Sequence, residues 1–167
     1  TGDNNTLIGY EAGDSIVTAS NNTFVGYLAG DANTASDNTG VGSKALEANT
    51  SGINVAVGYR ALDANTTGTS NVALGVDALG GNVDALTTGS QHTLIGSNAG
   101  GALTSGTALT AVGYNAGTAV TTGSNNVLIG HSSGDAITEG ANNVTLGNNT
   151  LGAVTTASNN TALGANA

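Results

Sequence analysis

Residues 21–27 read Asn-Asn-Thr-Phe-Val-Gly-Tyr, residues 54–59 read Asn-Val-Ala-Val-Gly-Tyr, and residues 159–164 read Asn-Asn-Thr-Ala-Leu-Gly. This pattern occurs ten times in the 167 residues, and each copy contains a glycine that we call the motif glycine. Successive motif glycines are 16 or 17 residues apart, with a single spacing of 21. Self-similarity at a short, nearly constant period indicates a repeat architecture. The ten motif glycines are Gly9, Gly26, Gly42, Gly58, Gly75, Gly96, Gly113, Gly130, Gly147 and Gly164.

The copies agree at several positions when they are aligned on the motif glycine. The residue before it is always Ile, Val or Leu, and the residue three before it is always Thr or Val. Asn stands four residues before it in eight copies, and the exceptions are His92 and Leu109. Ala stands three residues after it in eight copies, and the exceptions are Ser133 and Thr150. Each aligned position therefore predicts a column of equivalent side chains.

The apolar segment of each copy is short and rich in β-branched residues, and it ends at glycine, which favours a short strand. The second half of the copy has room for a second short strand and a turn. A helix is disfavoured even at residues 44–48, because Gly and Thr-Thr-Gly interrupt the copies and isolated helical turns are unstable. Stacking equivalent strands predicts an all-β fold, a parallel β-solenoid or β-roll of ten 16–17-residue rungs. Residues 1–167 then form one repeat domain.

The columns have predictable roles in such a solenoid. Asn side chains would form a hydrogen-bonded ladder along the axis, and the Ala columns would keep the interior thin. The motif glycine would allow close approach of neighbouring rungs. We expect Val57 and Ile129 in that interior, so that aspartate at either position would destroy folding. The long spacing after Gly75 predicts a loop near residues 82–85.

The strand is expected to be apolar on both faces. Residues one and three before the motif glycine share one face, and the residue two before it points to the other. That second column is mostly apolar and includes Leu7, Phe24, Leu94 and Leu128. A strand that is apolar on both faces predicts that other copies of the chain pack against the roll.

The composition excludes several classes of protein. Gly, Thr and Asn dominate the chain, whereas aromatic residues make up 3% and charged residues 8%. Lys44 and Arg60 are the only basic residues besides two histidines, and the net charge is −9, which excludes binding to a phosphate backbone and disfavours anionic membranes. No apolar run is long enough for a transmembrane helix, and the absence of Cys excludes disulfides and thiolate metal sites.

The segments at 21–27, 54–59, 71–75 and 159–164 resemble the head repeats of trimeric autotransporter adhesins, and also repeats of bacteriophage tail fibres. The resemblance spans the whole chain. It implies a homotrimer of left-handed parallel β-rolls, a rod shape and a role in attachment. The repeat is longer than is usual in adhesin heads, and the Thr-Thr-Gly-Ser-Asn-Asn connection is closer to the fibre type.

We find no pattern that predicts catalysis, a cofactor or a resident metal, and we therefore expect a protein that is not an enzyme. His92 lies in the Asn column, where it is expected to replace an Asn of the ladder. His131 follows a motif glycine directly and is expected to replace a Tyr. The two histidines thus belong to different rungs and different columns, and neither has a neighbouring nucleophile and carboxylate.

One acidic column stands out, five residues after the motif glycine, at Asp14, Asp31, Glu47 and Asp63. Like charges on successive rungs repel one another. The preferred interpretation is a solvated edge that keeps the rod soluble, with Lys44 and Arg60 offsetting part of the repulsion. The alternative is a weak cation edge for Ca²⁺, although no calcium-loop spacing is present.

The leading hypothesis is a structural or adhesive fibre segment, outside the cell, on a cell surface or on a virion. Its expected partners are other copies of itself, as a homotrimer and in an end-to-end filament, and a surface receptor that the sequence does not name. The chain starts and stops within the repeat, which predicts a segment of a longer fibre. A glycan-processing solenoid is disfavoured, because four Tyr and one Phe provide few aromatic platforms.

An ice-binding solenoid is the alternative from another class. A Thr column occurs eight residues after the motif glycine or at the aligned position, although the next Thr points the other way. Its members are Thr34, Thr50, Thr66, Thr87, Thr104, Thr121, Thr138 and Thr155.

Overall fold

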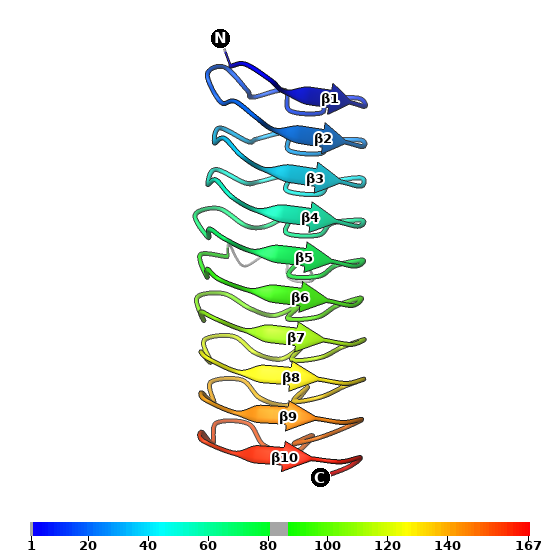
Figure 1. Ribbon diagram of the computed structural model, residues 1–167, viewed down its shortest axis with the longest axis vertical. Coiled ribbons are helices and arrows are strands. Elements are labelled where there is room, and N and C mark those ends of the chain that lie inside the picture. Colours follow the sequence, from blue (N-terminus) through cyan, green and yellow to red (C-terminus); the bar gives the residue numbers. More distant parts are fainter. Residues whose placement is uncertain (1, 81–86) are drawn as a thin grey trace.

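The computed structural model describes residues 2–80 and 87–167 and forms a straight stack of rungs (Figure 1). The described residues contain ten strands of three residues each in a single parallel sheet, and each strand pairs with its neighbour in sequence. The predicted all-β parallel β-solenoid is thereby confirmed. The strands are β1 (Thr6–Ile8), β2 (Thr23–Val25), β3 (Thr39–Val41), β4 (Val55–Val57), β5 (Val72–Leu74), β6 (Thr93–Ile95), β7 (Thr110–Val112), β8 (Val127–Ile129), β9 (Val144–Leu146) and β10 (Thr161–Leu163).

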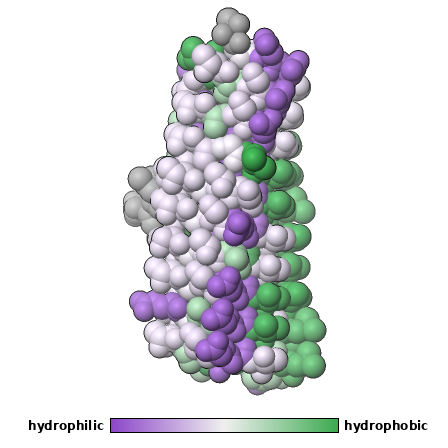
Figure 2. All heavy atoms as spheres, turned by 60° about the vertical axis from the view of Figure 1, so that its left-hand side comes forward, coloured by the Kyte–Doolittle hydropathy of each residue, from purple (hydrophilic) through white to green (hydrophobic). Residues whose placement is uncertain are grey.

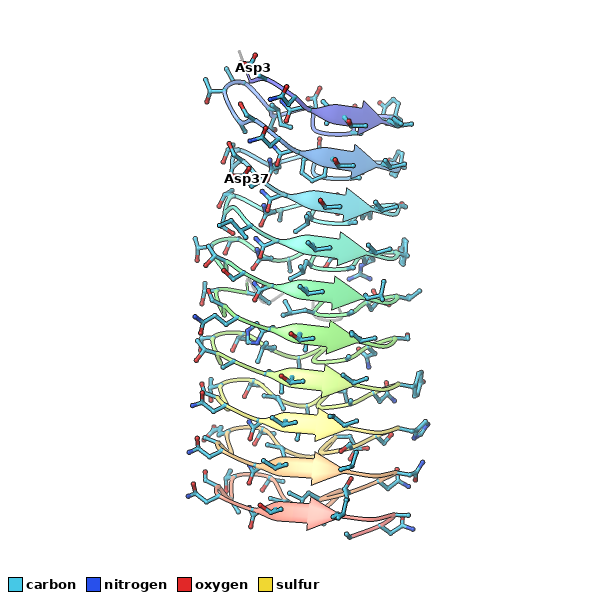
Figure 3. All side chains as sticks on the ribbon, in the orientation of Figure 1. Asp3 and Asp37 are labelled. Carbon is cyan, nitrogen blue, oxygen red and sulfur yellow. The ribbon has the colours of Figure 1, made fainter. Side chains whose placement is uncertain are left out.

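Every strand consists of the three residues before a motif glycine, so equivalent residues pair in register along the whole sheet. The long spacing after Gly75 does not disturb this register, because Val72 of β5 pairs with Thr93 of β6. The loop expected near residues 82–85 lies outside the described residues. The side chains of equivalent residues form columns along the rod, as Figure 3 shows.

The expected second strand is absent from the described part of each rung, where turns and one isolated bridge between Asn65 and Thr87 replace it. The second and fourth residues after the motif glycine have left-handed backbones, as at Lys44 (φ 62°) and Leu46 (φ 58°). This alternation bends the chain into consecutive corners and prevents an extended segment. The helix considered for residues 44–48 is likewise replaced by turns.

The interior is formed by the residue two before the motif glycine together with the Ala column. Phe24, Ala56 and Leu128 are fully buried, and the column alanines from Ala29 to Ala116 are also buried. The residues on either side within each strand point outward. The expectation for Val57 and Ile129 is therefore wrong, because both are only half-buried on the outer face.

Most rungs fill their interior with one large and one small residue at two facing positions. Where the inward strand residue is large, as Phe24, the fourth residue after the motif glycine is Gly30, and a Cβ there would lie 2.5 Å from the Phe24 ring. Where the strand residue is Gly40, the matching position is the fully buried Leu46. The exchange keeps the interior volume of each rung nearly constant, as close packing requires.

Leu109, one of the two exceptions in the Asn column, has a related explanation. In its rung the inward strand residue is Ala111 and the matching position is Gly117, so both are small. Leu109 is fully buried, and a Cβ on Gly100 or Gly117 would lie within 4 Å of its side chain. Leu109 therefore fills the volume that neither of the usual positions supplies.

Candidate functional site: the outer face of the sheet

The most distinctive surface is the outer face of the sheet, formed by the residues one and three before each motif glycine, which we call the outer stripe. One of its two columns is aliphatic in all ten copies, and the other contains only Thr and Val. Figure 2 shows it as a hydrophobic band that runs along the rod. Its exposed aliphatic members are Ile8 (59%), Val55 (39%), Val72 (41%), Leu74 (45%), Ile95 (38%), Val144 (45%), Leu146 (49%) and Leu163 (73%).

Aromatic side chains border the outer stripe, at the position directly after the motif glycine. Tyr10 and Tyr27 stack with ring centroids 5.6 Å apart, and Tyr114 stacks with His131 at 5.3 Å. His131 thus takes the place of a Tyr, as expected from the sequence.

The predicted Asn ladder is confirmed. In each bonded pair the side-chain Oδ1 of one Asn accepts a hydrogen bond from the backbone N–H of the equivalent residue on the next rung, as from Asn22 to Asn5 (2.9 Å) and from Asn71 to Asn54 (3.1 Å). His92 continues the ladder in place of an Asn, because its Nδ1 accepts from the N–H of Leu109 at 3.1 Å. The ladder stabilises the corner before each strand by satisfying buried polar groups.

Two buried polar clusters were not predicted. Asn33, Asn49 and Asn65 form a second ladder, in which Asn49 Nδ2 donates to Asn33 Oδ1 at 2.8 Å and Asn65 Nδ2 donates to Asn49 Oδ1 at 2.7 Å. Their shared position, seven residues after the motif glycine, is the signal that an alignment of that column would have given.

The second cluster explains the exceptions in the Ala column. The hydroxyl of Ser133 makes hydrogen bonds with those of Thr145 and Thr150, and Thr150 also donates to the carbonyl of Gly147 at 2.7 Å. Three polar substitutions on neighbouring rungs therefore satisfy one another in the interior. The cluster contains no base or charged group, and we assign it a structural role.

The acidic column is stacked as predicted, since the backbones of Asp14, Asp31, Glu47 and Asp63 lie on successive rungs. Exposure to solvent varies along the expected solvated edge, because Asp14 is exposed whereas Asp63 is only 7% exposed. Lys44 Nζ lies 3.0 Å from Glu47, and Arg60 Nε lies 2.7 Å from Asp63, which confirms that the two cations offset part of the charge. Burial raises the pKa of Asp63, and the Arg60 guanidinium opposes that effect.

No group of three His, Cys, Asp or Glu side chains suited to a metal ion occurs among residues 2–80 and 87–167. Within the same ranges no helix has the length and apolar character needed to span a membrane. The proposed cation edge at Asp14, Asp31, Glu47 and Asp63 thus gains no support from the geometry.

We expect Asp31→Asn to leave the rod folded and slightly more stable at neutral pH. The pKa of Asp31 is raised, first by partial burial and then by the nearby Glu11, Asp14 and Glu47, so its charged form opposes folding. Because solvent screens this position, the gain is below about 1 kcal/mol. The advantage over the wild type shrinks as the pH falls through the raised pKa and Asp31 becomes neutral. Thermal unfolding at pH 7 and at pH 4 measures both effects, and unfolding of the variant at pH 7 would contradict this account.

The Thr column considered for ice binding lies along one side of the rod. Five of its eight hydroxyls donate to backbone carbonyls of the next rung, as from Thr104 to Thr121 (3.1 Å) and from Thr121 to Thr138 (3.2 Å). These hydrogen bonds hold rungs together and engage the donor that would otherwise face water.

Comparisons with protein-family models, with curated proteins and with solved structures give no match.

Proposed function

We propose that this chain is a structural and adhesive fibre segment, in which copies of the chain associate through the outer stripe as a homotrimer. The support comes from the rod-like stack of rungs and from an uncharged aliphatic surface that repeats on every rung. The resemblance of the repeats to adhesin heads and tail-fibre repeats points in the same direction. Such a rod holds a receptor-binding tip away from a cell or virion, or binds a surface along its side.

The continuous outer stripe is the observation that carries the proposal. Monomeric soluble proteins rarely expose a contiguous apolar surface along their whole length. Other copies of this chain are the partner that fits the stripe best. The side chains of the stripe recur once per rung, so two identical stripes placed side by side stay in register along their whole length. Closed cyclic symmetry would cover the stripe on each copy in the same way.

Ice binding is the alternative proposal for the same rod. The separate Thr column uses five of its eight hydroxyls within the rod, whereas the outer stripe carries a Thr hydroxyl on six rungs. The proposed extracellular, cell-surface or virion location follows from the fibre role.

We expect the purified chain to have a mass in solution of three times the 15.9 kDa of one chain. Light scattering coupled to size exclusion at micromolar concentration measures it. The double variant Leu74→Ser, Ile95→Ser removes two neighbouring aliphatic groups from the stripe and is expected to shift the mass toward the monomer. The matched control is Ile53→Ser, since Ile53 is 64% exposed but lies at a corner outside the stripe. A folded wild-type monomer would overturn the trimer.

A further inference from the structure

Two residues other than Asn occupy the Asn ladder at one place in the rod, on the rungs of β6 and β7. Asn71 Oδ1 accepts from the His92 N–H at 3.0 Å, and His92 Nδ1 accepts from the Leu109 N–H at 3.1 Å. Leu109 offers no acceptor to the next rung, whereas Asn126 resumes the ladder toward Asn143 at 2.9 Å. An imidazole and a leucine therefore stand in succession where the other rungs have Asn.

Among the described residues, the groups next to His92 carry no charge. It is 1% exposed, and its contacts are with Asn71, Gly89, Leu109 and Gly106. The rung before it contributes Asn71, its own rung contributes Gly89, and the rung after it contributes Gly106 and Leu109, none of which titrates. Nε2 faces the Gly106 carbonyl but makes no hydrogen bond of normal geometry.

The hydrogen bond to Leu109 fixes the protonation state of the ring. Because Nδ1 accepts a hydrogen bond, the neutral ring carries its proton on Nε2. A second proton must bind at Nδ1. It would point at the Leu109 N–H, so that two hydrogen-bond donors would face each other without an acceptor. Protonation therefore removes the one ladder bond at this boundary and places an unpaired charge in the interior.

We propose that the boundary between the rungs of β6 and β7 is an acid-labile joint, at which protonation of His92 separates the rungs while the rest of the rod stays folded. This inference is independent of the proposed fibre function. An Asn in the same column cannot respond in this way, because its amide does not titrate between neutral and acidic pH.

The direction of the pH dependence follows from linkage. Burial lowers the pKa of His92 from 6.5 to about 4 in the folded rod, so the opened joint binds the proton more strongly. The closed joint is fully stable above pH 6.5 and loses stability as the pH falls toward the lowered value. The opening equilibrium constant increases about tenfold for each pH unit in that window.

Two single-cysteine reporters test the joint, because the chain has no Cys of its own. Ala111→Cys places a fully buried thiol on β7, and Ala56→Cys places one in the equivalent column of β4 as the control. Both are labelled with a pyridyl disulfide, which reacts in acid, at pH 7.5 and at pH 4.5. We expect the ratio of the two labelling rates to increase about 100-fold at the lower pH. In a His92→Asn background the ratio should stay constant.

An unchanged ratio in the wild-type background, or an equal increase with His92→Asn, would overturn the proposal. His92→Gln serves the same purpose if the Asn variant fails to fold. A direct readout comes from the ring-proton NMR signal of His92 in a His131→Asn background, which leaves a single imidazole. We expect that signal to keep its neutral position at pH 5.5, and a ring half-protonated near pH 6.5 would also overturn the proposal.

Discussion

Leu128→Asp is expected to unfold the rung of β8, whereas Ile129→Asp, one residue further along the same strand, leaves the chain folded. Leu128 is fully buried and faces the interior, where the described residues provide no cation to pair with a carboxylate. Loss of its packing alone costs about 2–5 kcal/mol, and the unpaired charge adds to this. Ile129 lies half-buried on the outer stripe, where its carboxylate replacement remains in contact with water in a single chain.

Circular dichroism and thermal unfolding at neutral pH compare the two variants. We expect a loss of the β signal or a strongly lowered Tm for Leu128→Asp, and a β signal close to that of the wild type for Ile129→Asp. The second variant should instead reduce the mass in solution, because it puts a charge on the proposed interface. Equal unfolding by both substitutions would show that the outer stripe is part of the folded core.

Gly113→Ala is expected to be strongly destabilising although it adds a single methyl group. Gly113 has φ +138°, and a Cβ there would lie 2.4 Å from the carbonyl oxygen of Gly130 on the next rung. Backbone cannot move aside as a flexible side chain would, and the left-handed conformation adds its own strain. We expect a loss of about 3 kcal/mol or more in the free energy of unfolding.

Gly152→Ala is the matched control for this prediction. Gly152 has no left-handed backbone, and the atom nearest to a Cβ added there would be 3.6 Å away, which is ordinary contact. We therefore expect its stability to stay within about 0.5 kcal/mol of the wild type. Chemical denaturation of both variants gives the comparison, and equal midpoints would contradict the role assigned to the motif glycines.

The columns and the register could be predicted from the sequence because the motif around each glycine is the same and all but one spacing is 16 or 17 residues. The same regularity explains why His92 and His131 could be assigned correctly as substitutes for Asn and Tyr. The orientation of the strand could not be read with equal success. Val57 is more apolar than the inward Ala56, and Ile129 is about as apolar as the inward Leu128, so hydrophobicity alone does not identify the interior.

Size, rather than hydrophobicity, identifies the interior. Only the inward strand residue varies in compensation with a partner six residues later, as in the pairs Phe24 with Gly30 and Gly40 with Leu46. Comparison of single columns does not detect this relation, because each column by itself looks irregular. The hydroxyl cluster of Ser133, Thr145 and Thr150 was missed for the same reason, since its members lie in two columns and on two rungs.

Hydroxyl-radical footprinting tests the central claim, that other copies of the chain cover the outer stripe. Leu74, Ile95 and Leu146 are 45%, 38% and 49% exposed in a single chain, and Ile53 and Val17, outside the stripe, are 64% and 74% exposed. The account predicts that Ile53 and Val17 are oxidised readily. It predicts that the three stripe residues are oxidised much more slowly than their exposed fractions in a single chain would give. Oxidation of Leu74, Ile95 and Leu146 in proportion to those exposures, in folded protein at micromolar concentration, would contradict it.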